Sequence, residues 1–194
     1  MSRIIGGHGK GRRLKAPKGL ETRPTGARVR QTLFDILAPR LPGCRFLDAF
    51  AGSGAVGLEA LSRGAARVVL VDQDREAVAA IEHNVRLLAP AGGQVEVFRQ
   101  DARTAGRALA DRGFRFDVVF LDPPYESSLY EPLLELSGTL LDDEGVAVAE
   151  HFHKKALPER IGRLARWREV RVGDHRLSFY GRAEHQGGGS GSEP

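Results

Sequence analysis

Two different periods of apolar and polar positions run along most of the chain, and they predict its elements. Short apolar runs of strand length alternate with segments in which apolar residues recur at helical spacing. The expected strands cover residues 44–50, 67–72, 94–101, 116–122 and 145–151. The expected helices lie between them, over residues 55–64, 75–88, 102–113 and 128–141. Two final strands, near 167–173 and 176–185, are not separated by a long helix, which predicts an antiparallel hairpin.

This alternation of strands and helices indicates an α/β fold. It predicts a doubly wound, mainly parallel sheet with helices on both faces. Ligands in such sheets bind beyond the carboxyl ends of the strands, so functional residues are expected where strands end. The chain finishes in GGGSGSEP, and residues 184–194 are expected to form a flexible tail without a role in the fold.

The first 42 residues have a different character from the rest. Residues 1–24 combine glycine and basic residues with few apolar anchors, which predicts an extended arm. A helix is expected to follow, with Thr25 as its N-cap. Its apolar face would hold Val29, Leu33, Ile36 and Leu37. The chain thus divides into an arm with its helix (1–42), an α/β domain (43–183) and the tail.

Positive charge is concentrated in this arm. The first 30 residues hold nine Lys or Arg and one acid, a net +8, although the whole chain carries only +4. The remaining residues therefore sum to −4. A basic arm on a slightly acidic body is typical of a protein that binds a polyanion. Charge alone fits a solvated, disordered tail equally well.

Cysteine and histidine usage excludes several classes of protein. Cys44 is the single cysteine, so there is no disulfide framework and no Cys-rich metal site. The six histidines lack ligand spacing, so no metal is expected. His151 and His153 follow the fifth strand and could face the pocket, but they are expected at the surface. The first residues lack an apolar signal core, and no apolar stretch approaches membrane-spanning length. These features predict a cytoplasmic protein that does not contact a membrane.

A glycine-rich turn follows the first strand. Gly52, Gly54 and Gly57 match the pattern G-x-G-x-x-G, and Asp72 lies 20 positions after the first of them. The pattern indicates a sharp turn that lets a ligand approach the backbone, with an acid placed for a ribose diol. It fits a nicotinamide-dependent dehydrogenase as well as other nucleoside cofactors. The glycines could also serve only the turn.

Acids at three successive strand ends favour one of these cofactors. Asp48, with Phe50, precedes the glycines, and a carboxylate there would repel a pyrophosphate but attract an α-amino group. S-adenosylmethionine (SAM) carries an α-amino group, a sulfonium and a ribose, and no phosphate. Asp48 would then face the amino acid end, Asp72 the ribose and Asp101 the adenine amine. The full set of candidate cofactor residues is Asp48, Phe50, Gly52, Gly54, Asp72, Asp101 and Ala102. Each acid alone could be a helix cap or a solvated turn residue.

The sequence Asp122-Pro123-Pro124-Tyr125 ends the fourth strand. Methyl transfer to an exocyclic amine needs hydrogen-bond acceptors that orient the nitrogen lone pair and relieve its developing charge. The Asp122 carboxylate and the Pro123 carbonyl could be those acceptors, on a backbone stiffened by two prolines. The Tyr125 ring could stack on a displaced base. A Pro-Pro turn that caps the strand, with the tyrosine as ordinary packing, is the simpler alternative.

These motifs resemble those of a known family. LDAFAGSGAVGLEALSRGA and FLDPPY resemble the class I SAM-dependent amino-methyltransferases. More narrowly, the segment from RIIGG to QTLFDIL and the later LSFYGR resemble the bacterial 16S ribosomal RNA guanine-N(2) methyltransferases. The resemblance covers roughly residues 3–182. It departs from the family pattern at His8-Gly9, at Val172 and at Asp72, where glutamate is usual.

The resemblance implies a fold, a cofactor and a substrate. The fold would have seven strands with the last one reversed, and SAM would bind around the glycines, Asp72 and Asp101. A guanine exocyclic amine, held by residues 122–125, would be methylated. The partner would be 16S ribosomal RNA, free or in an assembling or assembled small subunit, and the protein is expected to be a monomer. RNA contacts are expected from Arg3, Lys10, Arg12, Arg13, Lys15, Lys18 and Arg23.

Three other functions remain open at this stage. The same Asp-Pro-Pro-Tyr motif occurs in DNA adenine and protein glutamine methyltransferases. A dehydrogenase would explain the glycines but would leave this motif without a role. A non-catalytic RNA-binding module is the alternative from outside the enzymes, although both Asp122 and the glycines are present.

Overall fold

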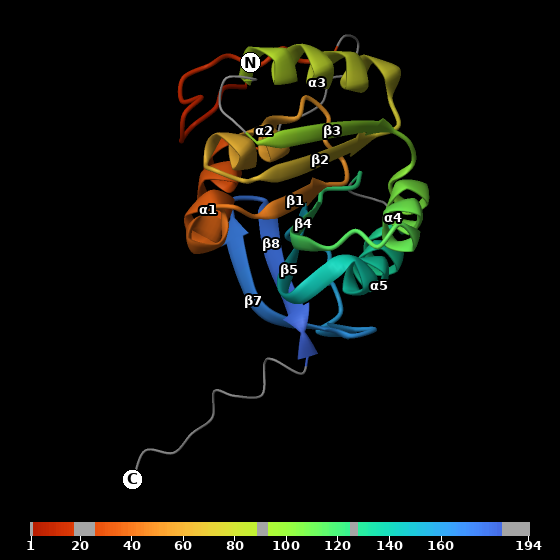
Figure 1. Cartoon of the computed structure of the whole chain (residues 1–194). Helices are drawn as coiled ribbons and strands as arrows, with labels where there is room; N and C mark the ends of the chain where they lie inside the picture. The colour runs from red at the N-terminus through yellow and green to blue at the C-terminus, as the bar shows by residue number, and fades with distance from the viewer. Residues whose placement is uncertain (1, 18–25, 89–92, 125–127, 184–194) are drawn as a thin grey trace.

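The computed structural model describes residues 2–17, 26–88, 93–124 and 128–183. These residues form one eight-stranded sheet in the order β3-β2-β1-β4-β5-β8-β7-β6 (Figure 1). The strands are β1 Arg45–Asp48, β2 Arg67–Asp72, β3 Gln94–Arg99, β4 Phe116–Leu121, β5 Leu141–Phe152, β6 Arg160–Ile161, β7 Leu164–Val172 and β8 His175–Arg182. The predicted α/β doubly wound fold is confirmed.

The sheet has a parallel half and an antiparallel half. Strands β1 to β5 pair in parallel, whereas β8 is antiparallel to both β5 and β7. The expected terminal hairpin and the reversed last strand are therefore present. The expected number of seven strands was wrong, because β6 adds a two-residue strand paired with β7. A strand that short has no periodicity from which to predict it.

Helices cover both faces of the sheet. The helices α1 Ala27–Leu37, α2 Ala55–Ser62 and α3 Arg75–Leu88 pack into one hydrophobic cluster, and the helices α4 Ala102–Asp111 and α5 Tyr130–Leu140 pack into a second. A 3₁₀ turn, Ala38–Arg40, follows α1. Of the four residues expected on the apolar face of α1, three are buried and Ile36 is partly exposed. Thr25, the expected N-cap, lies outside the described residues, and Gly26 occupies the N-cap position.

The expectation of an extended arm was wrong for the residues that the structure describes. Residues 2–17 form a hairpin, here called the N-terminal hairpin, with a bridge between Arg3 and Arg13. The amide of Ile4 donates to the carbonyl of Arg12, and that of Leu14 to the carbonyl of Ser2. Ile4 and Leu14 are each 1% exposed and join the cluster that contains α1, α2 and α3. These two apolar side chains anchor the segment in the core of the domain.

Buried polar groups on α2 hold the N-terminal hairpin in place. The Glu59 carboxylate accepts from the amides of Ile5 and Gly6, each at 2.7 Å, and from Arg63 Nε at 2.8 Å. Ser62 Oγ accepts from the amide of Gly9 at 2.8 Å. Hairpin amides that lack a cross-strand partner therefore find acceptors on the helix, as buried backbone donors require.

Asn84 on α3 joins the hairpin to the glycine-rich turn. Its Oδ1 accepts from the amide of Lys15 at 2.8 Å, and its Nδ2 donates to the carbonyls of Lys15 and Ser53, both at 2.9 Å. The side chain is fully buried. One amide thus fixes the end of the basic segment relative to the turn between Gly52 and Gly54.

In the described part of the chain, no helix has the length and apolar character needed to cross a membrane.

Candidate active site at the carboxyl edge of the sheet

Strand register brings the predicted acids to one edge of the sheet. Asp48 pairs with Leu70 of β2 and with Phe120 of β4. Asp72 and Asp122 therefore each lie two residues beyond the register position of Asp48. Asp101 follows β3 in the same way, two residues beyond Arg99, the partner of Asp72. All four candidate carboxylates thus lie at the carboxyl ends of neighbouring strands, where this fold binds ligands.

The glycine-rich turn has the geometry of a ligand cradle. Gly52 and Gly54 have φ angles of 55° and 78°, in the left-handed region that favours glycine. A Cβ atom on Gly52 would meet nothing within 4 Å, so a ligand has room to approach this backbone. A Cβ atom on Gly57 would lie 2.3 Å from Leu70 Cδ2. The third glycine therefore serves the packing of α2 on β2.

Two of the predicted acids hold this turn directly. Asp72 Oδ2 accepts from the amide of Gly52 at 2.8 Å, and Asp48 Oδ2 accepts from the amide of Gly57 at 3.0 Å. Asp72 Oδ1 also accepts from the amide of Asp74 at 2.9 Å. The sequence reasoning missed this role. Each carboxylate keeps acceptor capacity, since two oxygens offer about four lone-pair positions.

Asp48 is an unusual acid because it is almost completely buried. The side chain is 1% exposed, and its Oδ1 has no hydrogen-bond partner among the described residues. Burial raises the pKa of Asp48 to about 7, against the opposing effect of the Gly57 and Phe50 amides. The negative charges of Asp72 and Glu150 raise this pKa further. An orphaned carboxylate oxygen beside an open turn fits a cationic ligand group such as an α-ammonium.

The end of the third strand is more exposed than that of the first. Asp101 is the N-cap of α4, where it accepts from the amides of Arg103 and Thr104 at 3.1 Å, and its side chain is 39% exposed. The cap interpretation is therefore correct for this residue, and it leaves the carboxylate within reach of a ligand. Ala102 is buried in the first turn of the same helix. Phe50 is half-buried against the second hydrophobic cluster.

The segment after β4 forms a fixed shelf. Asp122 is partly exposed, Pro123 is buried and Pro124 is exposed, whereas Tyr125 lies outside the described residues. The buried hydroxyl of Tyr130 donates to the carbonyl of Glu150 at 3.0 Å and, more weakly, to the carbonyl of Pro123 at 3.3 Å. Tyr130 was expected only as part of a helix, because nothing in its local pattern indicates a contact with the shelf.

Behind this shelf, the fifth strand carries further titratable groups that the sequence did not place. His151 is fully buried, so its expected surface position was wrong, and its Nε2 lies 2.9 Å from Ser178 Oγ. Burial lowers the pKa of His151 from its ordinary value, which keeps the ring neutral near pH 7. Glu150, 1% exposed, pairs with His175 Nδ1 at 2.8 Å. His153 is half-buried, and its Nδ1 lies 3.0 Å from the Asp174 carbonyl.

The basic residues of the N-terminal hairpin face solvent. All five that the structure describes are exposed, and none forms an ion pair with another described residue: Arg3, Lys10, Arg12, Arg13 and Lys15. Lys18 and Arg23 lie outside the described residues. The hairpin is thus a rigid support for cations that the rest of the described chain does not neutralise. Across the described ranges, no group of three or more His, Cys, Asp or Glu side chains could hold a metal ion.

Comparisons with known proteins identify relatives of this chain. The profile of the family described as Conserved hypothetical protein 95 matches residues 2–181. The chain is 39% identical over 188 residues to Ribosomal RNA small subunit methyltransferase D of Escherichia coli strain K12, covering 95% of this chain and 91% of that protein.

Solved structures of similar proteins agree with these sequence similarities. The structure of YhhF from Escherichia coli has a TM-score of 0.80 at 39% identity, covering 93% of this chain and 97% of that one. The structure of the Thermus thermophilus protein TTHA0928 has a TM-score of 0.79 at 36% identity, covering 92% and 98% of the two chains. The resemblance seen in the sequence motifs is thereby confirmed at the level of the family.

Proposed function

The chain belongs to the Conserved hypothetical protein 95 family, and we propose that it transfers a methyl group from SAM to the exocyclic N2 amine of a guanine in 16S ribosomal RNA. One observation carries the proposal. The Asp122-Pro123 shelf ends the strand next to the one that leads into the open glycine turn and the buried Asp48. An acceptor for an amine thus adjoins a cradle for a cationic cofactor.

The cofactor is proposed to lie across the strand ends. The orphaned oxygen of Asp48 would accept from the α-ammonium, and Asp72 would accept from the ribose hydroxyls while it keeps its bond to the Gly52 amide. Asp101 would accept from the adenine amine beside its capping bonds. Gly52 leaves space for the cofactor to approach the backbone. Each interaction pairs an anionic or acceptor group with a donor that the cofactor offers.

The chain's contribution to the reaction is to orient the target amine. When bound, SAM supplies an electrophilic methyl group, whose carbon–sulfur bond breaks as the amine nitrogen bonds to carbon and sulfur keeps the electron pair. The Asp122 carboxylate and the Pro123 carbonyl would accept hydrogen bonds from the two N–H groups of the amine and so direct the nitrogen lone pair. Asp122 would relieve the positive charge that develops on nitrogen. The methylated nitrogen then loses its extra proton readily, so a strong general base is not required.

Ribosomal RNA is the proposed substrate on two grounds. The Escherichia coli relative is named as a small-subunit ribosomal RNA methyltransferase, and the similarity covers 91% of that protein. The exposed cations of the N-terminal hairpin suit phosphate groups. We propose that the protein acts in the cytoplasm as a monomer, on 16S RNA or on a particle that contains it. Tyr125 would stack on the displaced base.

The test is methylation of 16S ribosomal RNA from a strain that lacks the enzyme, with SAM carrying a labelled methyl group. We expect label on the N2 of one guanine, located by mass spectrometry of the digested RNA. Asp122→Ala should lose this activity and keep SAM affinity within a few-fold by calorimetry. Label in DNA or protein but not in RNA would instead support the other amino-methyltransferases, and binding of NAD in place of SAM would support a dehydrogenase.

A further inference from the structure

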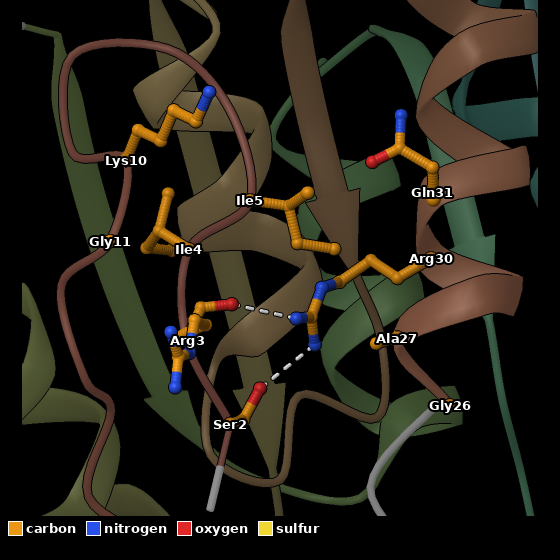
Figure 2. Close-up of a pocket in the computed structure, with 10 residues that line it drawn as sticks. All are labelled: Ser2, Arg3, Ile4, Ile5, Lys10, Gly11, Gly26, Ala27, Arg30 and Gln31. Atoms are coloured by element: carbon orange, nitrogen blue, oxygen red, sulfur yellow. Dashed lines mark hydrogen bonds between the residues drawn. The ribbon is translucent and has the colours of Figure 1, made fainter.

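A pocket of about 580 Å³ lies away from the strand ends, between the N-terminal hairpin and the first turn of α1 (Figure 2). Its volume is within the range of pockets that hold small ligands. Three of its lining side chains are cationic, namely Arg3, Lys10 and Arg30, and no carboxylate of a described residue lines it. Ile4 and Ile5 supply an apolar wall. This composition suits a ligand that is part anionic and part flat and apolar.

Arg30 is the unusual residue of the pocket. It points from α1 toward the hairpin, where its two terminal nitrogens donate to Ser2 Oγ at 2.8 Å and to the Arg3 carbonyl at 2.7 Å (Figure 2). The residue is only 2% exposed, and its Nε has no hydrogen-bond partner among the described residues. No described acid forms an ion pair with it, although Glu59 acts on it from farther away. A buried guanidinium with a free donor and incomplete neutralisation points to an anionic ligand.

The first turn of α1 adds positive potential to the same pocket. Gly26 is the N-cap, so no described side chain caps the helix, and the first turn contains no acid. Gly26 and Ala27 both line the pocket. The unpaired amides of a helix N-terminus attract phosphate groups. The guanidinium of Arg30 and the N-terminus of α1 therefore both add positive potential to this pocket.

We infer that this pocket binds one nucleotide of the RNA substrate other than the methylated guanine, with its phosphate near Arg3, Lys10 and the α1 N-terminus. This inference rests on the proposed function, because it takes RNA as the substrate. The apolar wall would contact the ribose or base. The hairpin that forms one side of the pocket is bonded through Asn84 to the glycine-rich turn. A nucleotide held here would therefore fix the RNA strand relative to the candidate active site.

The test uses a charge placed in the pocket without harm to the fold. Ala27 is exposed at the first position of α1, where glutamate stabilises a helix. Ala27→Glu should keep or raise the melting temperature, yet weaken binding of transcribed 16S RNA by about tenfold, as like charges do in an interface. Ala27→Gln, of the same size, should bind like the wild type. Ala108→Glu, at an exposed position on α4, controls for the change in net charge.

A purely structural role of Arg30 predicts a different outcome. If Arg30 only pins the hairpin to α1, Ala27→Glu and Ala27→Gln will bind RNA equally, and the inference is wrong. Arg3→Gln provides a second arm, since it removes a cation of the pocket but keeps the carbonyl that Arg30 binds. It should weaken RNA binding with an unchanged melting temperature, and wild-type affinity would count against the pocket.

Activity measurements separate this inference from the proposed function. At saturating RNA, Ala27→Glu should methylate at the wild-type rate, with the loss confined to KM. RNA binding that responds to Ala27→Glu without any methyl transfer by the wild type would support the pocket and refute the proposed function. Methyl transfer by the wild type, with a KM for RNA that is unchanged in Ala27→Glu, would do the reverse. A wild-type protein that bound no 16S RNA would refute both.

Discussion

Asp48→Asn should stabilise the protein and weaken its affinity for SAM. The carboxylate is buried, and its pKa is raised to about 7 from the usual value of about 3.9 in an unfolded chain. The folded state therefore binds a proton more tightly than the unfolded state does between these two values. Stability contributed by the protonated carboxyl is complete below about pH 4 and is lost as the pH rises to about 7.

The size of this effect follows from the shift. Each pKa unit is worth about 1.4 kcal/mol, so a shift of about three units makes the ionised Asp48 cost up to about 4 kcal/mol above pH 7. Asparagine has nearly the same shape, and its carbonyl oxygen can still accept from the Gly57 amide. The variant should therefore exceed the wild type in unfolding free energy at pH 8 by about 2–4 kcal/mol.

Urea unfolding at pH 5.5, 7 and 8.5 measures this difference. The advantage of Asp48→Asn should grow by up to about 1.4 kcal/mol per pH unit toward pH 7 and then level off. Asp101→Asn makes the same change at a side chain that is 39% exposed and is the matched control for burial. A variant that is less stable than the wild type at pH 8.5 would refute the view that the ionised Asp48 destabilises the folded state.

SAM binding supplies the second measurement for the same residue. An α-ammonium beside Asp48 would lower its pKa, so the wild type should release protons on binding SAM near pH 6.5. Calorimetry in two buffers of different ionisation enthalpy detects that release. Asp48→Asn should release none and should bind SAM at least ten times more weakly. Equal affinity of the two proteins would remove Asp48 from the cofactor site.

Three further variants test the support of the site and the proposed RNA contacts. Tyr130→Phe removes the hydroxyl that donates to the Pro123 carbonyl and should lower kcat several-fold with SAM affinity unchanged; an unchanged kcat would mean that the shelf needs no such support. Asn84→Ala removes a buried side chain that forms three hydrogen bonds and should cost about 2–4 kcal/mol in urea unfolding, together with some SAM affinity. Reversing the charge of Arg12 and Arg13 should weaken RNA binding and flatten its dependence on salt, and an unaltered slope would show that neither contacts phosphate.

The sheet could be predicted from the sequence because its signals are local. Each parallel strand is a short apolar run, and the helices between them carry clear periodicity. The strand ends then followed from the fold itself, so the sequence alone was enough to assign Asp48, Asp72 and Asp122 to one edge. The pattern of Gly52, Gly54 and Gly57 predicted the sharp turn after the first strand.

The rest of the site depends on contacts between distant residues, which no local pattern encodes. Glu59 lies more than 50 positions from the hairpin amides that donate to it, and the hydroxyl of Tyr130 donates to the carbonyl of Pro123 from a different element, α5. Arg30 did carry a signal. It shares the buried stripe of α1 with Leu33 and Leu37, at spacings of three and seven, where an arginine needs a special reason. A lone charge inside an apolar stripe is therefore worth noting at the sequence level.

The docked hairpin changes how the protein must engage RNA. Detaching it would leave Glu59, a fully buried carboxylate, without the amides of Ile5 and Gly6. Hydrogen bonds to a charged group are worth about 1.5–3 kcal/mol each, so the two together oppose detachment by about 3–6 kcal/mol. The detached hairpin is then a minor state. The cations of the hairpin are consequently in place before any RNA arrives, and the RNA binding proposed above would avoid most of the entropy cost that a disordered arm would incur. The RNA would then have to adapt to the hairpin, rather than the hairpin to the RNA.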